Sequence, residues 1–383
     1  MTGTVYDFDS TLDRSGTWSL KWDRYRGRDV IPMWVADMDF RSPPEVLSAL
    51  HARVDHGVFG YVEPGPELAE SIIARLAESY GWAPKHESFV WLPGLVSGLN
   101  IVCRAVGEPG DEVITGVPIY PPFLSAPVNA QRRCVRVPLA LEGQRWRFPA
   151  ASLESAVTDR SRLFLLCNPH NPVGRAYDRS ELEALAEVCL RRNLVVCSDE
   201  IHCGLVLDEG VRHIPFASLG EEVAARTITL MAASKTFNLP GLGSAFAIIP
   251  DRALRARVTG VMHGIVHRPM TIGLWATLAA YRDGEPWRKA LVEYLRRNRD
   301  LVSERVSRWP GYSMTPVEAT YLAWLDCRGS GMADPRKAFE DGGVGLYEGA
   351  DFGTPGFLRL NFGCPRSQLV EALDRMGRVI AGG

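Results

Sequence analysis

The chain has 383 residues, of which 46% are hydrophobic and 23% are charged, and this is the composition of an ordinary globular protein. Its 43 basic and 45 acidic residues leave a formal net charge of −2, so no strong field favours nucleic acid as a partner. No stretch approaches the ~20 apolar residues of a membrane span, and the acidic, polar start of the chain does not resemble a signal peptide. We therefore expect a cytoplasmic protein that binds neither nucleic acid nor a membrane.

The eight cysteines are scattered through the chain and form no CxxC pair. In a chain of this size without a secretion signal, such cysteines are expected to be buried, reduced thiols. Cys197, His202 and Cys203 are of the residue types that bind metals, but two of them are adjacent and no second cluster completes a tetrahedral site. The sequence therefore predicts no metal site.

Short apolar runs alternate with a helical pattern through the middle of the chain. Residues 162–167 are apolar almost throughout, as in a strand that is covered on both faces, and residues 178–190 carry apolar side chains at helical spacing. Strands are predicted at residues 111–115, 162–167, 194–198, 227–231 and 244–249. This order predicts an α/β fold whose large domain has a mostly parallel sheet flanked by helices.

The pattern changes from about residue 286. A long amphipathic helix is predicted at residues 287–309, and two strands (320–325 and 356–362) and a last helix (367–380) follow it. These elements favour a smaller α+β domain. We expect three parts: an N-terminal segment that packs with the small domain (1–45), the large domain (46–285) and the small C-terminal domain (286–383).

Three polar residues follow predicted strands of the large domain. Asn171 comes after residues 162–167, Asp199 after residues 194–198, and Lys235 after residues 227–231. Because ligands of an open parallel sheet bind beyond the carboxyl ends of its strands, these side chains are expected to converge. Each residue alone has an ordinary explanation, as a turn, a helix cap or a surface lysine.

Together, the three groups suit one cofactor. Pyridoxal phosphate needs a lysine amine for its Schiff base and a carboxylate that keeps its ring nitrogen protonated. It also takes a neutral hydrogen-bond donor beside its ring hydroxyl. The order amide, carboxylate and lysine on successive strand ends therefore predicts a pyridoxal phosphate site.

Longer motifs around these residues resemble a known family. NPHNPVG (168–174), SDEIH (198–202) and ASKTFNLPGLG (233–243) are similar to the fold type I pyridoxal-phosphate-dependent enzymes of the aminotransferase class I/II superfamily. PMWVADMDF (32–40) and FLRLNFGCPR (357–366) resemble the MalY/PatB group of cystathionine β-lyases, or cysteine-S-conjugate β-lyases. The resemblance implies the fold type I architecture and a homodimer with active sites at the subunit interface.

The resemblance also implies roles around the cofactor ring. Lys235 would form the Schiff base, Asp199 would hold the ring nitrogen, and Asn171 would donate to the ring hydroxyl. Tyr120 would stack on one face of the ring and Ile201 would close the other. Lys235, Tyr120 and Asp199 are the expected catalytic residues.

The phosphate is expected at a helix N-terminus, where backbone N–H groups are free. Gly94, Leu95 and Val96 open a predicted helix and would contribute these groups. Ser234 is a further candidate, and the resemblance implies that Tyr61 reaches the phosphate from a second subunit. Ala232 stands where many members of the family have a serine, so one phosphate hydrogen bond is expected to be missing.

Arg359 matches the arginine that binds the substrate α-carboxylate, and its forked guanidinium suits that group. The family pattern also puts Tyr120 and Asn171 beside the substrate, and Val35 and Ala36 are expected to offer it backbone contacts. Asp37, in the same segment, is interpreted either as a substrate neighbour or as a structural cap. His202 is assigned no chemistry. Arg268 is interpreted either as a group that recognises an acidic or bulky substrate or as an exposed arginine at a helix end.

The expected reaction is α,β-elimination from L-cystathionine or another S-substituted L-cysteine, which gives a thiol, pyruvate and ammonia. The fold supports other reactions, so an aminotransferase or other aldimine chemistry, for example on a specialised cysteine S-conjugate, remains the alternative. Some members of the family also bind a transcription factor, but no sequence feature encodes such a partner.

Overall fold

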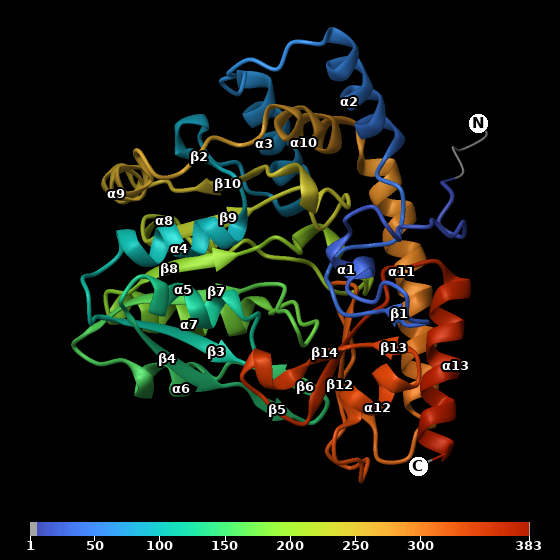
Figure 1. Ribbon diagram of the computed structural model, residues 1–383. Helices are drawn as coiled ribbons and strands as arrows, with labels where there is room; N and C mark the ends of the chain where they lie inside the picture. Colours follow the sequence, from blue (N-terminus) through green and yellow to red (C-terminus); the bar gives the residue numbers. More distant parts are fainter. Residues whose placement is uncertain (1–5, 383) are drawn as a thin grey trace.

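The computed structural model describes residues 6–382 and has a central sheet of seven strands (Figure 1). Residues 1–5 and 383 of the expected terminal parts lie outside the described residues. In spatial order the strands are β2 (Phe89–Leu92), β10 (Ala245–Ile248), β9 (Thr227–Met231), β8 (Val195–Asp199), β7 (Ser161–Cys167), β3 (Glu112–Val117) and β4 (Arg133–Pro138). The strands predicted in this region are all present, and the fold type I architecture is confirmed.

One strand of this sheet runs against the rest. β10, predicted at residues 244–249, pairs antiparallel with both β2 and β9, whereas the other neighbouring pairs are parallel. Parallel neighbours need a long crossover, usually a helix, but the link from β9 to β10 contains only the short 3₁₀ turn η4 (Pro240–Leu242). The chain therefore turns back directly, and this link carries Lys235.

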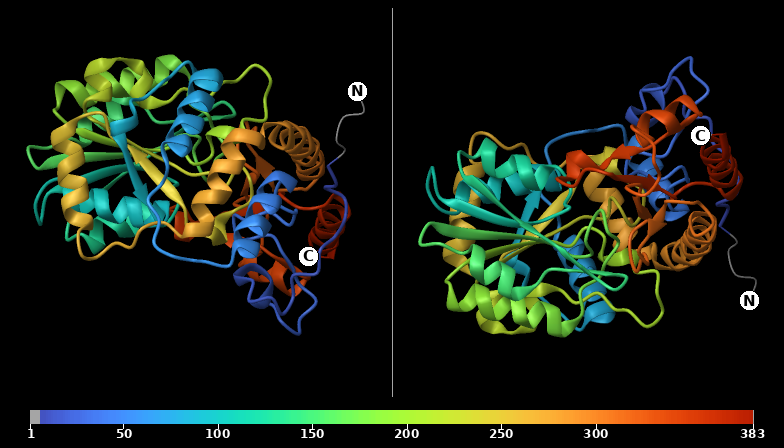
Figure 2. Two further views of the ribbon diagram at one scale, coloured as in Figure 1. Left: turned by 90° about the horizontal axis from the view of Figure 1, so that it is seen from above. Right: turned by 90° about the horizontal axis from the view of Figure 1, so that it is seen from below.

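Helices cover both faces of the sheet (Figure 2). α4 (Leu95–Ala105) packs against α5 (Pro122–Asn129) and α9 (Arg252–Met262), and α7 (Arg179–Arg191) packs against α6 (Ala150–Ala156) and α8 (Glu221–Ala224). Successive residues of β7 point to opposite faces, so Leu163 and Leu165 join the core under α4 while Phe164 and Leu166 join the core under α7. Burial on both faces explains why this strand is apolar throughout.

The C-terminal part forms a second, antiparallel sheet. Its strands are ordered β11 (Ser313–Met314), β12 (Leu322–Asp326), β15 (Phe357–Asn361) and β14 (Tyr347–Glu348). The long helix α11 (Glu285–Val306) packs against α13 (Arg366–Gly382), which also contacts α12 (Pro335–Asp341). From the N-terminal part, β1 (Ile31–Pro32) pairs with β13 (Val344–Gly345). The division of the chain at residues 45 and 285 stays a prediction.

The remaining elements complete the layers. α2 (Pro44–His56) and α3 (Pro66–Tyr80) pack against α10 (Thr271–Asp283). The other short elements are α1 (Leu20–Asp23), β5 (Ala140–Glu142), β6 (Arg145–Arg147), η1 (His86–Ser88), η2 (Cys203–Leu205), η3 (Phe216–Leu219) and η5 (Gly349–Phe352). Within residues 6–382, no helix has the length and apolar character needed to cross a bilayer.

Candidate active site

The carboxyl ends of β7, β8 and β9 meet at one cavity of about 300 Å³, between the central sheet and the N-terminal part of the chain. Asn171, Asp199 and Lys235 all line it, so the three polar residues that follow these strands do converge. The other predicted site residues that line the cavity are Ala36, Gly94, Leu95, Val96, Tyr120, Ile201 and Ser234. Ala232, which stands where many members of the family have a serine, also lines the cavity.

Three predicted residues do not line this cavity. Arg359, on β15, is buried behind Asn171, and its guanidinium donates to Asn171 Oδ1 at 3.0 Å and to the Trp34 carbonyl at 2.9 Å. The Val35 carbonyl accepts a hydrogen bond from the amide of Asn361 at 2.5 Å. Tyr61 is fully exposed, on the loop between α2 and α3.

The helix α4 presents its N-terminus to the cavity. Its cap is Gly94, which has no side-chain hydrogen bond to offer, and its first turn contains no acidic residue. The first amides of a helix have no partner within the helix, and they attract anions. A Cβ added to Gly94 would meet nothing within 4 Å, so the space beside this backbone is open. These features fit a phosphate group.

Asp199 is a buried carboxylate that forms no ion pair with any residue of 6–382. Its recorded hydrogen bond comes from the Ile201 backbone N–H at 3.1 Å. Burial raises the pKa of Asp199 to about 7, and Lys235 lowers it only in part. A buried carboxylate without a counter-charge fits a cationic ring nitrogen as its partner.

Lys235 points its amine at the N-terminal part of the chain, where Nζ donates to the Ala36 carbonyl at 2.5 Å. Burial lowers the pKa of Lys235 to about 8, and the positive charge of Arg359 acts in the same direction. Near neutral pH a useful fraction of this amine is therefore uncharged. An uncharged amine can bond to a carbonyl carbon and can accept a proton.

Sequence reasoning missed two residues beside the cavity and gave no role to a third. Tyr321 donates its hydroxyl hydrogen to the Ala36 carbonyl at 2.9 Å, and Asn361 bonds the carbonyls of Val35 and Asp37. His202, which was assigned no chemistry, is buried and lines the cavity, and burial holds its pKa well below the usual range. The only signals for these two residues were motifs that resemble the family: Tyr321 opens YLAWLD (321–326), and Asn361 lies within FLRLNFGCPR.

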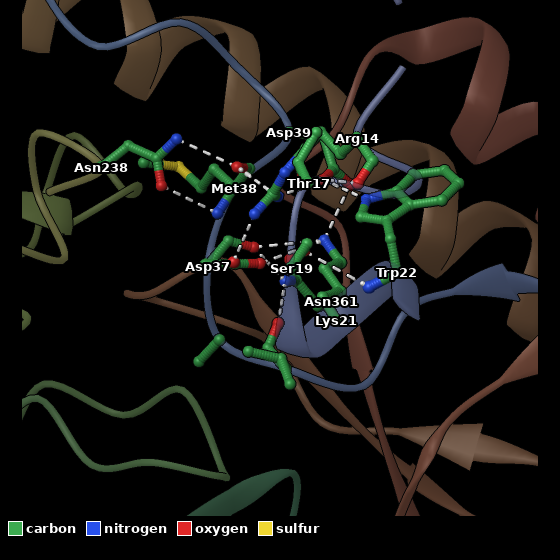
Figure 3. Close-up of polar contacts among 12 residues, drawn as sticks. Arg14, Thr17, Ser19, Lys21, Trp22, Asp37, Met38, Asp39, Asn238 and Asn361 are labelled. Atoms are coloured by element: carbon green, nitrogen blue, oxygen red, sulfur yellow. Dashed lines mark hydrogen bonds and ion pairs between the residues drawn. The ribbon is translucent and has the colours of Figure 1, made fainter. Parts of the chain in front are cut away.

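Asp37 is not a helix cap. It belongs to an N-terminal ion cluster of Arg14, Lys21, Asp37 and Asp39 (Figure 3). Lys21 Nζ lies 2.7 Å from Asp39 Oδ2, and Arg14 Nη1 lies 2.6 Å from Asp39 Oδ1. Burial alone would raise the pKa of Asp39, but Lys21, Trp22 and Arg14 together lower it. The cluster fixes the chain that runs past Ala36.

Replacement of Asp39 by alanine is expected to lower the free energy of unfolding by about 3–5 kcal/mol, because it removes the nearest counter-charge of the buried ammonium of Lys21 and leaves Arg14 and Lys21 to share Asp37. Urea unfolding of the enzyme would measure the change. The control is Glu183→Ala, which removes an exposed ion pair with Arg179 and should cost less than about 1 kcal/mol. Equal effects of the two changes would show that the cluster adds little to stability.

Arg268 lies in the link between α9 and α10 and does not line the cavity. Its guanidinium is exposed, pairs with Glu63 and donates to the Val62 carbonyl. Within one chain these contacts favour an exposed arginine over a group that recognises substrate. Arg268 lies in a link, however, and not at a helix end.

The sequence model of the "aminotransferase class I and II" family matches residues 28–376. The chain belongs to this family. It is 37% identical to cystathionine beta-lyase PatB of Bacillus subtilis (strain 168), over 97% of this chain and 98% of PatB. Among solved structures, OvoB superposes with a TM-score of 0.96 at 47% identity, covering 99% of this chain and 100% of OvoB. The pyridoxal-phosphate-bound C–S lyase from Staphylococcus hominis superposes with a TM-score of 0.91 at 30% identity, covering 98% of each chain.

Membership in the aminotransferase class I and II family makes the chain a pyridoxal-phosphate-dependent enzyme, and two of the relatives that it matches along nearly its whole length are named as a cystathionine β-lyase and a C–S lyase. The residues present fit the cofactor: a buried amine of lowered pKa, a buried carboxylate without a counter-charge and an open helix N-terminus all border one cavity.

Proposed function

We propose that the enzyme cleaves L-cystathionine and related S-substituted L-cysteines to a thiol, pyruvate and ammonia. The observation that supports this most is the convergence of Asn171, Asp199 and Lys235 in one cavity. Burial there lowers the pKa of the lysine and raises that of the aspartate. The likeness to a named cystathionine β-lyase along nearly the whole chain supports the substrate class.

Nine residues that line the cavity would hold the cofactor at its ring and at its phosphate. At the ring, Lys235 would bond it, Asp199 would hold the ring nitrogen and Asn171 would donate to the ring hydroxyl. Tyr120 and Ile201 would cover the two faces. Ser234 and the backbone amides of Gly94, Leu95 and Val96 would hold the phosphate. When bound, pyridoxal phosphate withdraws electrons from the Cα of an attached amino acid, which labilises the Cα proton and a leaving group on Cβ.

Arg359 is the proposed partner of the substrate carboxylate. Its guanidinium is buried and forms no ion pair within residues 6–382, and its Nε has no hydrogen-bond partner there. Burial lowers the pKa of Arg359 to about 10, which shows how poorly its charge is compensated. A carboxylate that enters this site would supply the missing charge and form a charge-assisted pair.

Lys235 would act as the base. Its uncharged Nζ takes the proton from Cα, the Cβ–S bond breaks with its electron pair on sulfur, and the thiolate takes up a proton to leave as a thiol. The remaining three-carbon fragment takes up one water and leaves as pyruvate and ammonia. Overall, one S-substituted cysteine and one water give one thiol, one pyruvate and one ammonium ion.

The alternative is an aminotransferase, which the name of the matched family favours. Product analysis with the cofactor-loaded enzyme separates the two, given L-cystathionine and a series of S-alkyl cysteines. We expect thiol, pyruvate and ammonia in equal amounts, at rates that rank the leaving groups. Absence of pyruvate, with the cofactor recovered as its pyridoxamine form, would overturn the lyase proposal and support the aminotransferase.

We propose that the enzyme is a homodimer in which Tyr61 serves the phosphate site of the other subunit. Tyr61 stands on a loop with Val58 and Phe59, both about 60% exposed, and Ile265 and Met270 are also exposed apolar residues. Such residues on the surface of one chain favour an interface. Sedimentation should give twice the mass of one chain, and Tyr61→Phe should weaken cofactor retention without changing that mass.

We also propose that the enzyme is cytoplasmic. Its eight cysteines are all free, six of them are buried, and none is paired in a disulfide. Reduced, buried thiols are typical of proteins in a reducing compartment. Fractionation of cells that produce the enzyme would test the location.

A further inference from the structure

The segment Trp34–Met38 is held in an unusual way. It has neither helical nor strand structure, yet each of its five carbonyl oxygens accepts a hydrogen bond from a side chain elsewhere in the chain. Arg359 donates to the carbonyl of Trp34, and Asn361 donates to that of Val35. Lys235 and Tyr321 both donate to the carbonyl of Ala36. Asn361 and Lys21 donate to that of Asp37, and Arg14 and Asn238 donate to that of Met38. Figure 3 shows the donors around Asp37 and Met38. Side chains from distant parts of the chain therefore set the position of this backbone.

The Ala36 carbonyl accepts a hydrogen bond from Lys235, whose amine the proposed chemistry must use. Lys235 Nζ lies 2.5 Å from the Ala36 oxygen, and it must leave that oxygen to bond the cofactor. Tyr321 Oη lies 2.9 Å from the same oxygen. Because Tyr321 immediately precedes β12, its hydroxyl stays when the amine departs. The Ala36 carbonyl therefore keeps a hydrogen bond both when the Lys235 amine is on it and when the amine is bonded to the cofactor. When substrate displaces the amine from the cofactor, this carbonyl is in place to receive it.

We propose that Tyr321 is a positioning residue for Lys235: by donating to the carbonyl that receives the released amine, it fixes where the amine waits and limits how strongly that carbonyl holds the charged form. This inference rests on the proposed role of Lys235 as the base. Tyr321 does not line the cavity, so it acts through Ala36 and not on the substrate.

The direction of the effect follows from the sharing of one acceptor. A carbonyl oxygen that already accepts from a hydroxyl is a weaker acceptor for an ammonium, so the Tyr321 hydroxyl disfavours charged Lys235. Burial raises the pKa of Tyr321 far above its usual range, so the hydroxyl remains a donor throughout the working pH range. Removal of the hydroxyl leaves the carbonyl entirely to Lys235 and is expected to raise the pKa of the amine.

The other charges around Lys235 do not change in this substitution. Arg359 disfavours the charged amine, whereas Asp37 and Asp199 favour it. His202 packs edge-on against the Tyr321 ring, with centroids 6.1 Å apart, and its low pKa keeps it neutral. Tyr321→Phe keeps the ring and therefore this packing.

The test compares full-length Tyr321→Phe with the matched control Tyr294→Phe. Tyr294 is also a buried tyrosine with a bonded hydroxyl, which donates to Asp9 and accepts from the Arg366 backbone, but it lies on α11 away from the cavity. Each protein is stripped of cofactor, pyridoxal phosphate is added, and the rate of covalent capture by Lys235 is followed against pH. Capture needs the uncharged amine, so the midpoint of the rate profile reports the pKa of Lys235.

For Tyr321→Phe we expect the midpoint to rise by about 0.5–1 pH unit, so that capture below the midpoint slows about 3- to 10-fold. The acid limb of the kcat profile should move by the same amount, with KM little changed. Tyr294→Phe should leave both profiles where they are. Site-specific 3-fluorotyrosine at position 321, a stronger donor of nearly the same size, should move the midpoint in the opposite direction.

An unchanged or lowered midpoint in Tyr321→Phe would overturn the inference. If Tyr321→Phe fails to fold, as judged by circular dichroism, the protein with 3-fluorotyrosine at position 321 serves as the test. An unchanged or raised midpoint in that protein would also overturn the inference. A failure of the role proposed for Lys235 gives a different result from a failure of the role proposed for Tyr321. In that case Lys235→Ala would capture the cofactor covalently at the rate of the unaltered enzyme.

Discussion

Replacement of Lys235 by alanine is expected to reduce kcat/KM by about 10³-fold or more while the chain stays folded. The cavity lining contains no other lysine, so no second amine can bond the cofactor or take the Cα proton. Pyruvate release from L-cystathionine measures the loss, and cofactor absorbance shows whether a covalent bond forms. The matched control is Lys289→Ala, an exposed lysine 3.9 Å from Glu285, which should keep full activity. Full turnover of the Lys235 variant would refute the assignment of the base.

Asp199→Asn is expected to cause a loss of similar size, about 10³-fold in kcat/KM, because a neutral amide cannot hold the ring nitrogen in its protonated form. The cofactor should also dissociate more readily, since the buried negative charge that attracts the ring is gone. Activity and cofactor retention after gel filtration test both effects. Asp351→Asn, at an exposed position, serves as the control. Near-normal turnover of Asp199→Asn would exclude the carboxylate from the chemistry.

The same variant makes a prediction about stability. In the cofactor-free chain the pKa of Asp199 lies near 7, above its ordinary value of 3.8. Between these values the folded chain binds a proton that the unfolded chain has lost, so the stability of the folded chain falls as pH rises from about 4 to about 7. The loss is on the order of 4 kcal/mol at most. Asp199→Asn should abolish this part of the pH dependence, and urea unfolding of both cofactor-free chains at pH 5 and pH 8 would detect it.

The strands and the convergence of the three polar side chains were predictable because they depend on local pattern. β7 is apolar throughout because both of its faces are covered. Asp199 is the last residue of β8, and Asn171 and Lys235 lie in the links that leave β7 and β9. The direction of β10 was harder to predict, since it depends on what the link after β9 contains. The residues of β10 have the pattern of one more parallel strand, but β10 is antiparallel to both of its neighbours.

Contacts between distant residues could not be predicted. Tyr321 and Ala36 are separated by 285 positions, and no periodicity links a tyrosine that precedes a strand to a backbone carbonyl in an irregular segment. The burial of His202 is similar, because it depends on the packing of Tyr321 against its ring. Asp37 was interpreted either as a substrate neighbour or as a local cap, but its partners Arg14 and Lys21 are brought to it by the fold of the N-terminal segment.

The reversal at β10 has a consequence for how Lys235 moves. Because β9 and β10 are antiparallel neighbours, with Met231 paired to Phe246, the link 232–244 leaves and re-enters the sheet at adjacent points. The backbone under the lysine is thus tethered at both ends, and its amine travels between the Ala36 carbonyl and the cavity by rotation about side-chain bonds. Rotation about side-chain bonds needs no displacement of the backbone, so it avoids the nanosecond-to-microsecond motions of loops. Return of the amine to its substrate should therefore not limit the rate of turnover.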